Sequence, residues 1–256
     1  MKNILHLVIL HTCLIMPLFS QNDTSDLNIL VFTKTDGYRH EVIPEASKTL
    51  MELGENNHWT LTFTEDAGLF TKSFLQRFDV IVFLQTINNI FDTKEKRAFQ
   101  QFIRSKKGFV AIHTGTITEM EWPWYEELIG TAFVGHPPVQ EAHLIIEDKT
   151  HPATRFFTNN EWIVTDEWYS FKSNPRANVH VLISIDENSY DVDNNEWFPG
   201  ARQRMGDHPM VWYREYEDSR IFQTALGHTA EIYRNELFRD HITGAVNWAG
   251  FRNQVE

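Results

Sequence analysis

The chain has 256 residues, of which 42% are hydrophobic, 23% charged and 13% aromatic. This ordinary globular composition excludes collagen-like, low-complexity and wholly disordered chains. The 23 Lys and Arg residues against 35 Asp and Glu residues give a net charge of −12, which repels polyanions, so nucleic acid and anionic lipid are not expected partners.

The first element is an apolar N-terminal stretch. Lys2 supplies a short positive region, residues 4–19 are largely apolar, and a polar run begins after Ser20. This pattern predicts a signal peptide over residues 1–20 and a secreted, periplasmic protein, with an uncleaved N-terminal anchor as the alternative. No stable membrane insertion is expected after cleavage, because the stretch is short for a membrane span. Cleavage removes Cys13, the single cysteine, so the mature chain has no thiol nucleophile.

The first half of the mature chain alternates strands and helices. Apolar or alternating runs predict strands at residues 27–33, 59–64, 79–84 and 108–112. Residues 41–53 have helical spacing, and we expect Gly54 to cap that helix. Asp92 and Thr93 begin a second amphipathic helix that runs through Ile103. This alternation predicts an open α/β sheet.

The second half is richer in strands. Strands are expected at residues 139–147, 179–186, 210–216 and 220–226, with a hairpin turn at 217–219 and a closing helix over 236–248. We expect these strands to extend the first sheet. No linker or repeat separates the halves, so residues 27–250 are expected to form a single domain.

Histidines gather where the expected strands end. In an open parallel sheet, ligands bind beyond the carboxyl ends of the strands. His113 directly follows a buried strand, and five other segments place a histidine or a carboxylate at a comparable end: His40, His136, Glu167, His208 and His228. Imidazoles and a carboxylate could form a zinc-type site or a metal-free acid/base cluster. The alternative is that each histidine only satisfies local hydrogen bonds.

Aromatic residues lie near the same loops, with Trp168 and Tyr169 directly after Glu167. Such rings suit stacking against sugar faces, although tryptophan more often packs in a core. We assign substrate binding to Tyr38, Arg39, Trp168 and Tyr169.

Four segments together resemble the ThuA-like (trehalose-utilisation) family of the class I glutamine-amidotransferase-like superfamily. They are residues 33–40, 108–113, 166–169 and 225–228. The resemblance covers nearly all of residues 27–250. It implies a flavodoxin-like three-layer sandwich, with a mostly parallel sheet that C-terminal strands extend.

The resemblance also implies a role in sugar catabolism, on an oxidised (3-keto) glycoside or related carbohydrate, as a hydrolase, lyase or isomerase. It places the catalytic groups at His113, Glu167 and His228. A zinc or other divalent metal is implied at His40, His113, His136 and His228, and no nucleotide cofactor is expected. Related amidotransferases carry a nucleophilic cysteine on the turn after the equivalent strand, where this chain has residues 112–115 and no cysteine, so thiolate-dependent glutamine hydrolysis is excluded. The rival interpretations are a carbohydrate-binding module or an accessory domain.

Overall fold

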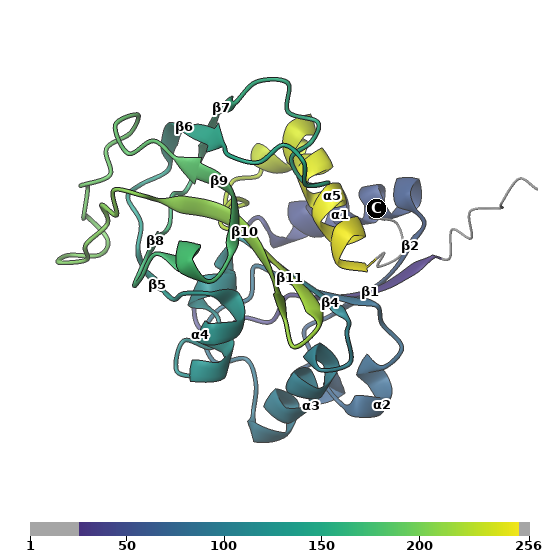
Figure 1. Cartoon of the computed structure of the whole chain (residues 1–256). Helices are drawn as coiled ribbons and strands as arrows, with labels where there is room; N and C mark the ends of the chain where they lie inside the picture. The colour runs from purple at the N-terminus through teal and green to yellow at the C-terminus, as the bar shows by residue number, and fades with distance from the viewer. Residues whose placement is uncertain (1–25, 251–256) are drawn as a thin grey trace, which may run out of the picture.

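The computed structural model describes residues 26–250, so the expected signal peptide lies outside the described residues. A nine-stranded sheet runs through the molecule in the order β2-β1-β3-β4-β11-β10-β9-β6-β7 (Figure 1). Its strands are β1 (Leu27–Phe32), β2 (Trp59–Thr64), β3 (Val80–Leu84), β4 (Gly108–Ile112), β6 (Gln140–Ile146), β7 (Glu161–Asp166), β9 (His180–Ile185), β10 (Pro209–Tyr216) and β11 (Ser219–Thr224). A small second sheet pairs β5 (Phe133–Gly135) with β8 (Ser170–Phe171).

The sheet has a parallel half and an antiparallel half. Strands β2, β1, β3, β4 and β11 pair in parallel, and β10, β9, β6 and β7 continue the sheet through antiparallel ladders. The expected α/β fold and its extension by C-terminal strands are therefore confirmed. The β10–β11 hairpin turns through Glu217 and Asp218, both at positive φ, as a two-residue turn with the twist of the strands requires.

Helices cover both faces of the parallel half (Figure 1). Helices α1 (Ile43–Asn57) and α5 (Glu236–Gly250) lie on one face, and α2 (Lys72–Leu75), α3 (Thr93–Ile103) and α4 (Pro123–Ile129) lie on the other. The alternation of side chains along β1 divides the core accordingly, since Ile29 packs with the α1 and α5 residues and Leu30 with the α3 residues. Within residues 26–250, no helix is long and apolar enough to span a membrane.

Two expectations about element ends were wrong. Helix α1 does not end at Gly54; it continues to Asn57, and His58 at φ 57° caps it. Gly54 serves instead as a contact point, because a Cβ there would lie 2.9 Å from Leu61 Cδ1 on β2. Strand β11 ends at Thr224, so residues 225–228 form a loop rather than a strand end. The alternating strand β7 and the short helix α4 were not predicted.

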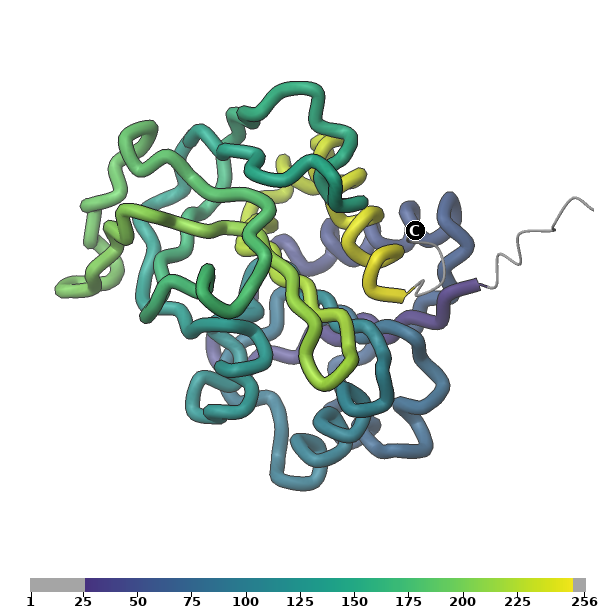
Figure 2. Tube along the Cα trace, in the orientation of Figure 1, coloured from purple at the N-terminus to yellow at the C-terminus, as the bar shows by residue number. Residues whose placement is uncertain are grey.

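Figure 2 traces the chain from β4 through the loops of the second half and back to β11 beside it. This return brings segments that are more than a hundred residues apart in sequence to one edge of the sheet, where the carboxyl ends of β1, β4 and β11 meet.

Candidate metal and substrate site

His113 sits on a sharp turn at the end of β4. Its backbone adopts φ 67° and ψ −81°, which is a rare conformation for a residue with a side chain and is found preferentially at functional sites. The ring Nδ1 lies 2.8 Å from the carbonyl oxygen of Ala225. Since a carbonyl only accepts hydrogen bonds, Nδ1 carries a proton, and in the neutral tautomer the lone pair lies on Nε2, on the other side of the ring.

Three groups face His113 Nε2. The Tyr169 hydroxyl lies at 3.1 Å, His228 Nδ1 at 3.3 Å and Glu167 Oε2 at 3.4 Å. His113 is fully buried and Glu167 is 2% exposed. In that tautomer Nε2 cannot donate a hydrogen bond, so it either accepts one or binds a metal.

The loop that carries His228 is fixed by a buried carboxylate. Asp166, the last residue of β7, accepts hydrogen bonds from the backbone N–H groups of Gly227, His228 and Thr229 at 2.6, 3.0 and 3.0 Å. Gln85 donates from its side chain to the Gly227 carbonyl oxygen at 2.6 Å. Three strands separate β7 from β11 in the sheet order, so the antiparallel half curls back to bring Asp166 to this loop.

Glu167 contacts a different histidine with each oxygen. Its Oε2 lies 3.2 Å from His228 Nδ1, and its Oε1 lies 3.1 Å from His136 Nδ1. Burial alone would raise the pKa of Glu167, but the neighbouring imidazoles of His113 and His228 together outweigh it and lower that pKa below its usual range. Burial is the largest single influence on His228 and lowers its pKa. The hydrogen bond to Glu167 and the charges of Glu167 and Asp166 together raise that pKa by more, so the net shift is upward.

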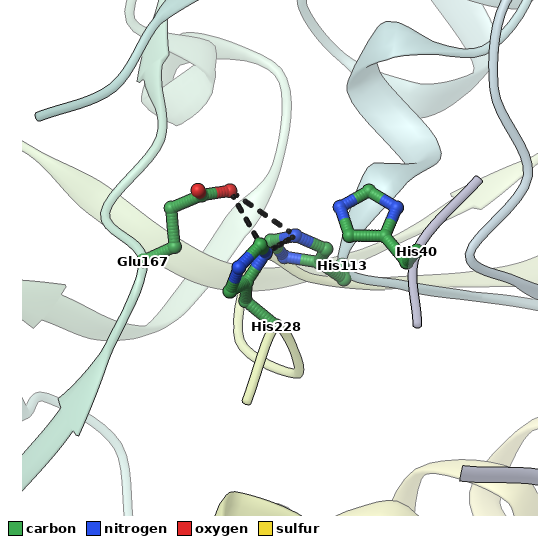
Figure 3. Close-up of side chains that lie close together, drawn as sticks. All are labelled: His40, His113, Glu167 and His228. Atoms are coloured by element: carbon green, nitrogen blue, oxygen red, sulfur yellow. Dashed lines mark hydrogen bonds and ion pairs between the residues drawn. The ribbon is translucent and has the colours of Figure 1, made fainter. Parts of the chain in front are cut away.

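Four side chains bring a ligand atom each within 4.8 Å of one another: His40, His113, Glu167 and His228 (Figure 3). His40 comes from the loop after β1, and its buried Nδ1 has no hydrogen-bond partner. Burial, together with the neighbouring His113 and His228, lowers the pKa of His40 to about 2, so its imidazole is neutral near pH 7.

These residues fit a transition metal. Neutral imidazoles and an ionised carboxylate are the ligands that zinc and similar cations take. The bond from His113 Nδ1–H to the Ala225 carbonyl is the outer contact by which metal-bound histidines are usually oriented.

A cavity of about 450 Å³ opens onto this cluster. Its wall is strongly aromatic, with Phe133, Tyr169, Trp197 and Phe198 on one side and Tyr38 at the rim. Trp197 is 54% exposed and stands edge-on to His136, with ring centres 5.3 Å apart. The volume lies in the range of small-molecule sites, and the few polar groups converge on its floor.

Comparison with known proteins agrees with this architecture. The family model described as trehalose utilisation matches residues 28–249. The chain belongs to the ThuA family. A crystal structure of a ThuA-like protein from Bacteroides uniformis superposes with a TM-score of 0.75 at 19% identity, covering 92% of this chain and 96% of that one. A ThuA-like protein from Parabacteroides merdae superposes at 0.68 with 17% identity, covering 90% and 93%.

The same fold occurs inside a larger enzyme. A β-galactosidase from Bacillus circulans superposes with a TM-score of 0.52 at 9% identity, covering 88% of this chain but 31% of the galactosidase. At this identity the likeness concerns the fold alone. No curated protein matches the sequence.

The structure of this ThuA-family chain brings together most of the residues singled out in its sequence. His40, His113, Glu167 and His228 form the cluster, and Tyr38 and Tyr169 line the cavity. His136 lies beside the cluster rather than within it, because its Nδ1 faces Glu167 Oε1 and the Pro137 carbonyl oxygen. Burial lowers its pKa more than the neighbouring Glu167 raises it.

Two expected substrate-binding residues lie elsewhere. Trp168 is fully buried, and its indole N–H donates to the Gln140 carbonyl oxygen at 2.9 Å, so it packs in the core. Arg39 does not line the cavity, and its guanidinium pairs with the Glu65 carboxylate at 2.6 Å. For Trp168, the two neighbouring residues Glu167 and Tyr169 line the cavity and Trp168 does not, an alternation typical of extended backbone.

Sequence reasoning missed Asp166 and Gln85 as supports of the His228 loop. It included Trp197 among the aromatic residues near these loops but did not distinguish it as the exposed ring of the cavity. Asp166 directly precedes Glu167 in the sequence, but nothing in the sequence indicates that its carboxylate accepts hydrogen bonds from residues 227–229. For Gln85 the sequence offers one indication of a role at the site, because Gln85 directly follows a buried strand as His113 does. In the structure Gln85 also adopts a positive φ, of 58°.

Proposed function

We propose that this ThuA-family protein is a secreted, periplasmic enzyme of sugar catabolism that acts on an oxidised (3-keto) glycoside or a related carbohydrate by metal-assisted acid/base chemistry. The observation that carries the proposal is the buried cluster of three histidines and Glu167 on the floor of an aromatic cavity. Aromatic walls suit the flat faces of sugar rings. A binding module needs no such buried, convergent ligand set.

His40, His113, Glu167 and His228 would hold the metal. A divalent cation supplies Lewis-acid polarisation of a carbonyl oxygen when it is bound in such a site. With those four side chains engaged, the proton next to a ketone has to pass to another group of the cavity wall.

His136 suits the role of general base better than His113 or Glu167, the two residues favoured by the sequence. Its Nδ1 faces two acceptors, Glu167 Oε1 and the Pro137 carbonyl, so Nδ1 carries the proton and Nε2 has the lone pair. A carboxylate that holds the far nitrogen of a histidine is the arrangement found in hydrolase triads. In the proposed step the C–H bond next to the ketone breaks, the proton moves to His136 Nε2, and the electron pair passes into the enolate.

Exchange with solvent deuterium tests this step without knowledge of the final product. Methyl 3-keto-glucoside is incubated with the protein in D₂O, and the signal of the hydrogen next to the ketone is followed by NMR. We expect exchange by the wild type and a loss of about 10²-fold or more in His136→Gln, in line with the usual contribution of a general base. His180→Gln, which alters an exposed histidine on β9, serves as the control. Exchange no faster with wild type than in buffer would refute the proposed chemistry.

An accessory role is the second candidate. The observation in its favour is the superposition on 31% of a β-galactosidase chain, which shows the same fold as one part of a larger glycosidase. This role predicts sugar binding without proton exchange, and the same NMR experiment separates the two functions.

A further inference from the structure

A second cavity of about 530 Å³ adjoins the aromatic one. The two cavities share Tyr38, His40 and His228. The histidine cluster therefore stands at the junction between two chambers rather than at the end of one. His40 is 5% exposed, lines both cavities and has the unpartnered Nδ1.

The two cavities differ in chemistry. The second has no tryptophan or phenylalanine in its wall, and its charged residues are Glu41, Glu45, Glu231 and Arg234. Arg234 lies 3.2 Å from Glu45 and 4.0 Å from Glu231, so its charge is already partnered. Three carboxylates against one guanidinium leave the wall net negative.

We infer that the substrate has two units that span the cluster, with one sugar ring in the aromatic cavity and a neutral or cationic polar unit in the second cavity. The inference rests on the proposed function for the identity of the first unit. Carboxylates bind hydroxyl and ammonium groups as acceptors, whereas they repel an anionic group placed beside them. A second unit that carries a carboxylate, such as a uronic acid, is therefore disfavoured.

The experiment compares binding of unoxidised sugars, so that it does not depend on turnover. Methyl glucoside, a set of glucose disaccharides and their counterparts ending in glucuronic acid are titrated by calorimetry. We expect at least one neutral disaccharide to bind about tenfold or more tighter than methyl glucoside, a difference of about 1.4 kcal/mol. Its glucuronic acid counterpart should bind severalfold more weakly, and Glu41→Gln combined with Glu231→Gln should reduce that difference.

Val139→Trp narrows the second cavity alone, since Val139 lines that cavity and not the aromatic one. It should abolish the advantage of the disaccharide and leave the binding of methyl glucoside unchanged. Ile163→Trp is the matched control, at an exposed apolar residue on β7 that lines neither cavity.

Equal binding of one-unit and two-unit sugars, no binding of either, or an advantage that survives Val139→Trp would overturn the inference. Failure of the proposed function is distinct, because it is seen as absent deuterium exchange while the graded binding of disaccharides persists.

Discussion

Gly227 is the position at which the smallest chemical change should disturb the site most. It adopts φ +126°, and a Cβ added there would lie 2.9 Å from the Tyr233 hydroxyl oxygen and 3.2 Å from Ile112 Cγ2. The backbone conformation alone costs a residue with a side chain about 1–3 kcal/mol. Overpacking against Tyr233 and Ile112 adds about 1–3 kcal/mol. Gly227→Ala should therefore lower the free energy of unfolding by about 2–6 kcal/mol.

Gly206→Ala is the matched control. Gly206 also has a positive φ, of +82°, but a Cβ there meets nothing within 4 Å. It should lose only the backbone contribution of about 1–3 kcal/mol. Urea unfolding measures both variants. Because the neighbouring His228 contributes to the cluster, Gly227→Ala should also weaken binding of Co²⁺ by about 10–100-fold, as displaced supports of metal ligands do. Equal losses of stability in both variants, with unchanged Co²⁺ affinity, would refute the reasoning.

Two further predictions concern the core and the cavity wall. Burial lowers the pKa of His241 to about 4 from an ordinary value of 6.5, so the unfolded chain binds the extra proton and stability falls as the pH drops from about 6.5 to about 4. Over that window His241 contributes about 1.4 kcal/mol per pH unit to the slope of the unfolding free energy against pH. His241→Gln should remove this contribution when urea unfolding is measured at several pH values, and an unchanged slope would contradict the assignment. Trp197→Ala should weaken sugar binding, measured by calorimetry, and leave the unfolding free energy within about 0.5 kcal/mol of wild type. Trp168→Ala should lower the unfolding free energy by about 3–5 kcal/mol, measured by urea unfolding. The reverse pattern would place the sugar elsewhere.

Local patterns were sufficient for the parallel half of the fold. The apolar runs of β1, β3 and β4 and the cap of α3 by Asp92 follow from periodicity and capping chemistry. Strand β7 was missed because its hydrophobicity does not follow its alternating burial: Ile163 is exposed, whereas the carboxylate of Asp166 is buried.

The cluster was predictable for a geometric reason. Carboxyl ends of neighbouring parallel strands meet at one edge, so a histidine after β1, β4 and β11 has to lie near that edge. The sequence does not show which side chains of the segment around Glu167 face the cavity. Trp168 was therefore assigned to substrate binding, whereas in the structure Trp168 is buried and Trp197 lines the cavity. Long-range supports such as Asp166 depend on how the antiparallel half curls, which no local pattern specifies.

The central claim is that His40, His113, Glu167 and His228 form a metal centre, and elemental analysis of the purified protein beside His113→Ala tests it most directly. His180→Ala controls for the loss of a histidine outside the cluster. We predict close to one equivalent of a transition metal in the wild type and in His180→Ala, and little or none in His113→Ala. A wild-type protein without metal after growth in metal-replete medium, or equal metal in all three proteins, would contradict the account.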